Sequence, residues 1–340
     1  MKVLVTGGAG YIGSTTCSAL IDSGHEPVIL DSLVTGREEF TYGRIFYKGD
    51  ISDRTVLAQI FKDHPDIYCT LHFAALIVVP DSVTDPYSYY TENVSKSLEF
   101  YKALTDFGLK RVVFSSSASI YDDAPGFMVT EDSPLNPRSP YARTKYMMET
   151  ILNDFTNAYD LRGVALRYFN PIGADPRMRS GMQVELPSHV LGKMISTAAG
   201  KEEKFLITGV DWPTRDGSGI RDYVHVWDLA MAHVKAVEKF DQIFETLSKD
   251  KGEAVSYVPI NLGAGNGVTV KELVKAFENV NKKKLPKREA PQREGDVAGS
   301  FANTDRAKAL LGWSANLSIE DGISDALKWA TVRDSLIKYR

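Results

Sequence analysis

The chain of 340 residues has only two cysteines, Cys17 and Cys69, which is too few for a disulfide framework or a zinc site built from cysteines. Its six histidines are scattered without the spacing of metal ligands, so we expect no metal site. No signal peptide fits the first residues, where a short strand pattern is followed at once by glycines. These features together favour a cytoplasmic protein.

The sequence also lacks a basic surplus and any long apolar segment. Lys and Arg number 40 against 44 Asp and Glu, and because nucleic acids are bound largely through basic residues, we expect no nucleic-acid partner. The longest apolar window, residues 73–79, is far shorter than the roughly 20 residues that cross a bilayer, so we expect no membrane segment. With 43% hydrophobic and 25% charged residues, the composition is that of an ordinary globular protein.

Short β-branched segments alternate with helical patterns through the first half of the chain. Several of these segments are apolar on both faces, which is typical of parallel strands covered by helices on both sides. The sequence therefore predicts an α/β fold with a doubly wound, Rossmann-type parallel sheet. We expect strands at residues 2–6, 26–31, 44–48, 67–74, 110–116 and 163–168, and helices at 12–23, 55–61, 93–107 and 142–159, with Gly24 and Gly108 as C-caps.

The alternation becomes irregular after Asn170, where longer loops begin. Loops of such length in a compact protein are usually functional. We expect a cofactor-binding domain at residues 1–170 that carries the catalytic residues, and a smaller α/β substrate-binding lobe at 171–340. Segments near 224–240 and 258–262 are expected to return to the main sheet.

A glycine-rich turn follows the first expected strand and opens the first helix. It matches G-x-G-x-x-G at Gly8, Gly10 and Gly13, a pattern that lets the backbone approach a pyrophosphate beside the free N–H groups of a helix N-terminus. Asp31 ends the second strand 18 residues after Gly13, where a carboxylate can accept both ribose hydroxyls and repel a 2′-phosphate. The combination predicts NAD rather than NADP. The alternative is a tight turn that binds no ligand.

Tyr141 and Lys145 lie four residues apart at the start of an expected helix, so both side chains project from one face. An ammonium beside a phenol favours the phenolate and lowers the phenol pKa from its ordinary value of about 10. Such a pair alone is common on helix surfaces. Here, however, Ser115 and Ser117 end a strand at the sheet edge where ligands bind, unless they simply cap that strand.

Three further motifs accompany these: residues 167–171 read RYFNP, 219–226 read GIRDYVHV and 293–296 read REGD. From Met1 to Trp313 the sequence resembles the extended short-chain dehydrogenase/reductase family, and within it enzymes that epimerise UDP-sugars at C4. The resemblance implies NAD as cofactor, a UDP-sugar as substrate and a homodimer formed through the helices at 93–107 and 142–159. The apolar stripes of these helices could equally belong to the core.

The resemblance also implies roles for individual residues. Ser117 and Tyr141 would hold the sugar 4-hydroxyl with Tyr141 as base, and Lys145 would bind the nicotinamide ribose. The implied cofactor site comprises Gly7, Gly10, Tyr11, Ile12, Gly13, Asp31, Asp50, Ile51, Phe73, Ala74, Ala75, Asn93, Ser115, Tyr141, Lys145, Tyr168 and Phe169. The implied substrate site comprises Ser117, Tyr141, Asn170, His189, Thr208, Arg221, Arg293, Asp296 and Ser300. Simpler roles are a loop cap for Asp50, a turn for Asn170 and surface ion pairs for the arginines.

Four positions bear on the substrate. Ile77 replaces a lysine that is common in the family, and Thr208 replaces an aromatic residue near the uracil. His189 stands where an asparagine often meets the substrate, although a core histidine is equally compatible. Ser300 stands where a tyrosine narrows the sugar pocket in some relatives, so it predicts acceptance of UDP-GlcNAc and UDP-GalNAc, unless it is a surface-loop serine.

The expected reaction passes hydride from the sugar C4 to NAD, gives a 4-ketosugar that turns in the pocket, and returns the hydride to the other face. A sugar-nucleotide 4,6-dehydratase would need an acid/base pair, and residues 116–118 (SSA) offer no carboxylate. A UDP-glucuronate or pentose 4-epimerase is a closer alternative. A non-catalytic NAD sensor would not need Ser117, Tyr141 and Lys145 together.

Overall fold

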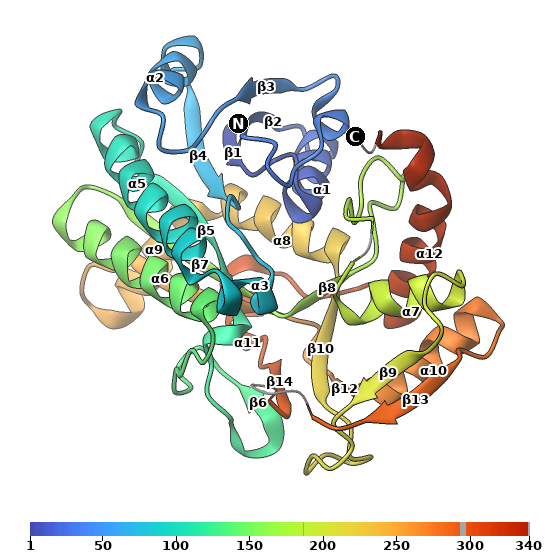
Figure 1. Cartoon of the computed structure of the whole chain (residues 1–340). Helices are drawn as coiled ribbons and strands as arrows, with labels where there is room; N and C mark the ends of the chain where they lie inside the picture. The colour runs from blue at the N-terminus through green and yellow to red at the C-terminus, as the bar shows by residue number, and fades with distance from the viewer. Residues whose placement is uncertain (186, 293–296, 339–340) are drawn as a thin grey trace.

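The computed structural model describes residues 1–185, 187–292 and 297–338. Its centre is a parallel seven-stranded sheet in the order β11-β7-β5-β4-β1-β2-β3, which confirms the predicted doubly wound fold (Figure 1). The strands are β1 (Lys2–Thr6), β2 (Glu26–Asp31), β3 (Ile45–Lys48), β4 (Ile67–His72), β5 (Arg111–Ser117), β7 (Arg162–Tyr168) and β11 (Tyr257–Leu262).

Alternate side chains of the central strands enter two different cores. On β1, Val3 and Val5 pack into one core and Leu4 into the other, and all three are fully buried. This follows from the two-residue period of a strand, because in a sheet covered on both faces both sets of alternating side chains are buried. The first core is closed by α1 (Tyr11–Asp22), α8 (Val226–Glu238) and α9 (Phe240–Lys251), and the second by α2 (Arg54–Asp63), α5 (Lys96–Asp106) and α6 (Pro140–Ala158).

The expected helices are present, with one difference before α5. The chain enters it through α3 (Val79–Thr84), α4 (Pro86–Tyr90) and a single π-helical stretch, η2 (Thr91–Ser95), so that the helical region starts earlier than expected. Gly24 and Gly108 follow α1 and α5 with φ of +78° and +79°, as predicted for C-caps. Short 3-10 turns lie at η1 (Glu38–Thr41), η3 (Ala118–Ile120) and η4 (Pro125–Phe127).

A second sheet lies beyond the carboxyl edge of the first and is built around β10 (Ile220–His225). Its other strands come from both halves of the chain: β6 (Met128–Val129), β8 (Asn170–Ile172), β12 (Gly267–Thr269) and β14 (Gly299–Ala302). A separate ribbon pairs β9 (Phe205–Thr208) with β13 (Lys287–Ala290), and the helices are α7 (Val190–Ala198), α10 (Val270–Asn281), α11 (Asp305–Leu311) and α12 (Ile319–Leu336). Because β6 joins this sheet while β11 joins the main one, the division into domains 1–170 and 171–340 stays a prediction.

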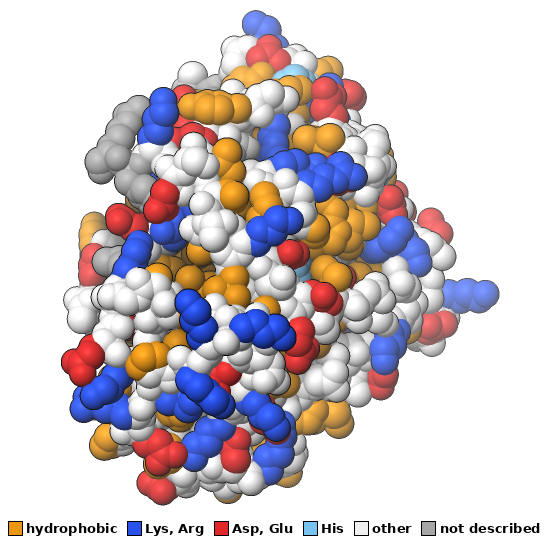
Figure 2. All heavy atoms as spheres, turned by 90° about the vertical axis from the view of Figure 1, so that its right-hand side faces the viewer, with side chains coloured by type: hydrophobic (Ala, Val, Ile, Leu, Met, Phe, Trp, Pro, Cys, Tyr) orange, Lys and Arg blue, Asp and Glu red, His pale blue; other side chains and the backbone are white. Residues whose placement is uncertain are grey.

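Helix α12 connects the second lobe to the first. Its Trp329 ring lies 6.0 Å from the ring of Phe40, and the Lys338 N–H donates to Glu39 at 2.9 Å, so residue 338 lies beside η1 (Figure 1). Figure 2 shows the face formed by α7, α10 and α12, with Lys and Arg side chains gathered in its lower part, at the height of β9, β13 and α10. None of the described helices is both long and apolar enough to span a bilayer.

Candidate active site

The glycine turn after β1 fits closely against the neighbouring loop and the first turn of α1. A Cβ on Gly13 would lie 2.2 Å from the Gly7 oxygen, and one on Gly7, whose φ is +72°, would lie 2.7 Å from the Ala74 nitrogen. Glycine is therefore required at both positions. No side chain caps α1, whose N-cap is Gly10, so the first amides of this helix face the sheet edge without a side-chain acceptor. This is the arrangement that binds a phosphate.

Asp31 is held rigidly at the end of β2. Its two oxygens accept the N–H groups of Ala9 at 2.9 Å and Leu33 at 2.8 Å, and a Cβ on Gly36 would come within 2.8 Å of the carboxylate. Burial raises the pKa of Asp31, while the two backbone hydrogen bonds oppose that shift. Each oxygen keeps a second lone pair, so the carboxylate can still accept the two hydroxyls of a ribose.

Several residues expected at the cofactor site have side chains that bind backbone groups of the protein and hold the neighbouring loops in place. Asn93 accepts the Leu76 N–H at 2.7 Å and donates to Leu76 O and Thr144 Oγ1, so it fastens the loop of Phe73, Ala74 and Ala75 to α6. The Tyr11 phenol donates to the carbonyl of Gly173 at 2.7 Å. Its ring therefore faces the second lobe, and only its backbone belongs to the phosphate turn.

Asp50 has the loop-capping role that the sequence left open. It accepts the Ser52 N–H at 2.9 Å and forms an ion pair with Lys96 at 2.7 Å. Ile12 packs at the margin of one core and Ile51 is buried in the other. Phe169 is buried with Tyr121 at the junction of the two sheets.

Lys145 and Tyr141 meet the serines of β5, as the spacing predicted. The buried Lys145 ammonium donates to the Ser115 carbonyl at 2.8 Å and lies 6.0 Å from the centre of the Tyr141 ring. Burial lowers the pKa of Lys145 to about 7, opposed by the charge of Glu149. The Ser117 hydroxyl lies 2.9 Å from that of Ser119.

The expected acidity of the Tyr141 phenol is not found in the chain alone. Burial raises its pKa above the ordinary value, and only the hydrogen bond from Ser117 lowers it. The expectation from sequence considered the nearby ammonium but not the removal of the phenol from water, which disfavours the phenolate. It also did not foresee that the Lys145 ammonium is directed at a carbonyl.

A buried ion pair behind this cluster was not anticipated. Glu149, one turn beyond Lys145, receives two bonds from Arg167 at 3.0 and 2.7 Å and one from the Ser116 hydroxyl. Arg167 also donates to the Tyr121 hydroxyl at 2.9 Å. Arg167 belongs to the RYFNP motif, but no spacing along the chain indicates that its partner is Glu149.

The substrate residues lie on the second sheet. Arg221 on β10 is paired in register with Ser300 on β14, and its guanidinium donates to the carbonyls of Val297 and Ala298 at 3.1 and 2.8 Å. Asn170 is exposed at the start of β8, and Thr208 ends β9. Arg293 and Asp296 lie outside the described residues.

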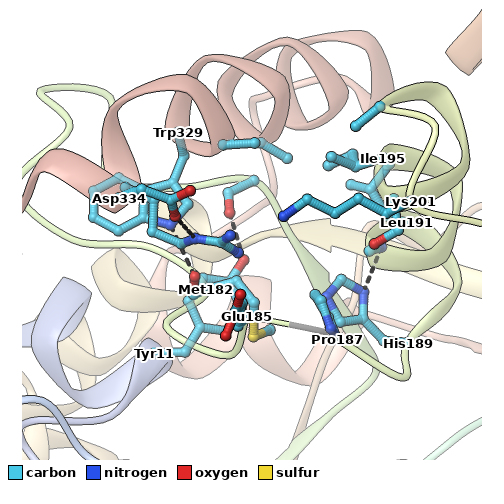
Figure 3. Close-up of a pocket in the computed structure, with 17 residues that line it drawn as sticks. Tyr11, Met182, Glu185, Pro187, His189, Leu191, Ile195, Lys201, Trp329 and Asp334 are labelled. Atoms are coloured by element: carbon cyan, nitrogen blue, oxygen red, sulfur yellow. Dashed lines mark hydrogen bonds and ion pairs between the residues drawn. The ribbon is translucent and has the colours of Figure 1, made fainter. Parts of the chain in front are cut away.

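His189 caps the N-terminus of α7. Its Nδ1 accepts the Gly192 N–H at 3.2 Å, and burial lowers its pKa to about 4, so the ring is neutral. With Tyr11 it lines a cavity of about 180 Å³ between α7 and α12, where Figure 3 shows Ile195 and Trp329 from the two helices. Ser117, Tyr141 and Lys145 do not line this cavity. Ile77 is 61% exposed on the loop before α3.

A phosphate-binding turn, a ribose-binding carboxylate and a Ser–Tyr–Lys cluster at one sheet edge define a nicotinamide-dependent enzyme of the short-chain dehydrogenase/reductase class. Within the described part of the chain, no group of His, Cys, Asp and Glu side chains is placed to hold a metal. Residues 3–247 match the family described as "NAD dependent epimerase/dehydratase family", and the chain belongs to it.

Individual proteins are similar to this chain over nearly its whole length. The UDP-glucose 4-epimerase of Bacillus subtilis is 41% identical, with 97% of this chain and 96% of that protein aligned. The UDP-glucose-4-epimerase of Stenotrophomonas maltophila, crystallised with NAD and formylated UDP-arabinopyranose, is 38% identical with a TM-score of 0.90, covering 98% and 99% of the two chains. The UDP-Glc/GlcNAc 4-epimerase of Campylobacter jejuni is 31% identical with a TM-score of 0.81, covering 97% and 99%.

Replacing Asp31 by Asn tests the ribose site. Because both carboxylate oxygens accept backbone N–H groups, the amide NH₂ of Asn must face one of them, and one acceptor for the ribose is lost. We expect NAD to bind about 10- to 100-fold more weakly in a calorimetric titration, with less discrimination against NADP. Asp53→Asn, at the exposed N-cap of α2, is the control and should bind NAD normally. An unchanged NAD affinity in Asp31→Asn would contradict the assignment.

Proposed function

We propose that the chain catalyses the NAD-dependent 4-epimerisation of UDP-sugars and interconverts UDP-galactose and UDP-glucose. The observation that carries the proposal is that Tyr141, Ser117 and Lys145 lie at the carboxyl ends of the same parallel strands as the glycine turn. The relationship to UDP-glucose 4-epimerases over 97% of the chain supports the choice of reaction. NAD would be held by the amides of the glycine turn and by Asp31.

NAD supplies a nicotinamide ring that accepts hydride from the sugar C4 and returns it. The chain provides the proton transfer: Tyr141 takes the proton of the 4-hydroxyl, and Ser117 holds the reacting oxygen by a hydrogen bond. With its pKa near 7, Lys145 carries its charge most fully in mildly acidic solution, and that charge favours the phenolate of Tyr141. Tyr141 then returns the proton after the 4-ketosugar has presented its other face.

The second lobe would hold the nucleotide end of the substrate. Arg221 is paired with Ser300, and Asn170 is exposed opposite Tyr223, two residues further along β10. The cation at Arg221 suits a diphosphate, whose oxygens accept guanidinium donors well. This placement would leave the hexose between β10 and Tyr141.

The alternative of a 4,6-dehydratase has less support. Its chemistry needs a free carboxylic acid near Ser116–Ala118, and among the described residues the carboxylate that binds Ser116 is that of Glu149. Both oxygens of Glu149 are occupied by Arg167, with Tyr257 as a further donor at 2.9 Å. A buried, fully paired carboxylate of this kind is not available for acid–base catalysis. The relationship to a protein crystallised with a UDP-pentose derivative keeps a pentose 4-epimerase as the second candidate.

Tyr141→Phe tests the reaction directly. Without the phenol hydroxyl the proton transfer is lost, so we expect kcat to fall about 10²- to 10⁴-fold while NAD stays bound. The assay is incubation with UDP-galactose followed by chromatographic separation of the sugar nucleotides. Tyr146→Phe is the matched control, since Tyr146 is on the same helix but exposed. Full turnover by a Tyr141→Phe protein that retains NAD would rule out the mechanism.

We further propose that the protein accepts UDP-GlcNAc and UDP-GalNAc because Ser300 leaves space beside the sugar 2-substituent. In Ser300→Tyr the phenol ring would occupy that space and exclude the N-acetyl group. The rate with UDP-GlcNAc should therefore fall at least tenfold more than the rate with UDP-glucose. Ser300→Ala keeps the space and should keep the ratio of the two rates. Equal losses for both substrates in Ser300→Tyr would remove the argument for a gate at this position.

We also propose a homodimer formed through α5 and α6. We further propose a cytoplasmic location, which agrees with the two cysteines being free thiols. These helices bury Phe100 and Met148 in the core but leave Leu98 and Met147 each 41% exposed on their other sides. Met147→Glu should convert the dimer to a monomer in sedimentation equilibrium, because a carboxylate would be buried unpaired. Met128→Glu, exposed on β6, should remain dimeric. A wild-type monomer, or a dimeric Met147→Glu protein, would contradict this interface.

A further inference from the structure

The loop that follows β2 contacts both the ribose carboxylate and the glycine turn. In this β2 loop, residues 32–40, the Leu33 N–H donates to Asp31 at 2.8 Å and the Arg37 N–H donates to the Ala9 carbonyl at 2.9 Å. Leu33 has a φ of +61°, in the left-handed region. That conformation is unfavourable for a residue with a bulky side chain, so other contacts must hold the loop in this shape.

Side chains from the second half of the chain hold the β2 loop from outside. The Gln183 side-chain amide donates to the Thr35 carbonyl at 3.2 Å, and Trp329 of α12 packs on Phe40 with the ring centres 6.0 Å apart. Phe40 and Trp329 are 4% and 2% exposed, and they belong to a small core that is separate from the two cores of the main sheet. The position of the β2 loop thus depends on residues that are far from it in the sequence.

Gln183 belongs to a short segment that α12 fixes in turn. We call this segment, residues 180–184, the strap. The Trp329 Nε1–H donates to the Met182 carbonyl of the strap at 2.9 Å (Figure 3). A Cβ on Gly181 would lie 2.6 Å from the Trp329 ring, so the strap lies directly on this side chain. Trp329 therefore contacts the strap and the β2 loop at once.

We propose that Gln183 and Trp329 are positioning residues that retain NAD, because together they hold the β2 loop against the carboxylate of Asp31. The inference rests on the proposed function, which requires NAD. A Cβ on Gly36 would lie 2.8 Å from Oδ1 of Asp31, the same oxygen that accepts the Leu33 N–H. If the loop moves away, this oxygen loses its donor and the carboxylate is no longer fixed where it can accept two ribose hydroxyls.

Gln183→Ala tests the strap. Alanine cannot donate to the Thr35 carbonyl, so the strained loop should leave Asp31 more often. We expect NAD to dissociate about three- to tenfold faster, the effect of one hydrogen bond, when labelled NAD is exchanged against an excess of unlabelled NAD. The amides of Leu33 and Arg37 should also exchange hydrogen faster in the NAD-free protein. With NAD in excess, kcat for UDP-galactose should stay within about twofold of the wild-type value, since the change does not touch the residues of proton transfer.

Trp329→Phe tests the contact between α12 and the strap. Phenylalanine keeps an aromatic ring near Phe40 but cannot donate to the Met182 carbonyl, so NAD should again dissociate about three- to tenfold faster. Because both side chains act through the strap, the two changes should not act independently. The double variant with Gln183→Ala should therefore release NAD more slowly than the product of the two single effects.

Gln59→Ala is the matched control, because Gln59 is an exposed glutamine of α2 whose amide donates to Asp63. This variant should retain NAD as the wild type does. Release of NAD from Gln183→Ala at the wild-type rate, equally fast release from Gln59→Ala, or single effects that simply multiply in the double variant would overturn the inference. If Trp329→Phe does not fold, as judged by its circular-dichroism melting curve, the rate in Gln183→Ala decides. Failure of the wild-type chain to bind NAD or to epimerise UDP-galactose would instead overturn the proposed function.

Discussion

The buried ion pair between Glu149 and Arg167 is the contact on which the catalytic geometry depends. Arg167 belongs to β7, Glu149 to α6, and the Ser116 hydroxyl of β5 is bound to the same carboxylate. Removing charges from water is costly, so such a pair persists only when both partners are fully hydrogen-bonded, as here. Since Lys145 and Tyr141 precede Glu149 by one and two turns, fixing this carboxylate fixes their height above Ser115 and Ser117.

The nucleotide end of the site depends on a different constraint, which is the close approach of main chains. Gly7 and Gly13 lie so near to each other and to the Ala74 loop that side chains cannot be accommodated. The same crowding brings free helix amides and the Asp31 carboxylate to one edge. Backbone packing thus shapes the nucleotide end of the site, and the side-chain ion pair shapes the catalytic end.

Much of the fold could be predicted because it follows from local patterns. The first two strands, Lys2–Thr6 and Glu26–Asp31, have the bounds expected from their apolar residues, and the spacing of Tyr141 and Lys145 places the two side chains on one face of α6, where Lys145 reaches β5. The sequence contains no such local pattern for contacts between residues that are far apart in the chain. The contacts of Glu149 with Arg167 and of His233 with Tyr168 join residues 18 and 65 positions apart, so only the folded sheet reveals them.

Protonation was the least predictable property, because it depends on burial as well as on neighbours. The Tyr141–Lys145 pair suggested an acidic phenol, yet burial raises the pKa of Tyr141 and lowers that of Lys145, which moves two nearly equal proton affinities apart. In the chain alone the phenol therefore keeps its proton, and a positive charge close to the phenol is needed to favour the phenolate that acts as the base.

One set of contacts joins the two lobes at α1 and η1. Arg179 binds Asp22 of α1 at 2.9 Å, the Tyr11 phenol binds Gly173, and Trp329 packs on Phe40, so aromatic and ionic contacts link α1 and η1 to the loop after β8 and to α12. These contacts do not involve the serines or Lys145. Together with the pairing of β6 with β14, they connect the second sheet to the first. An enzyme built in this way gains by retaining its cofactor, because the hydride leaves and returns across the same fixed edge.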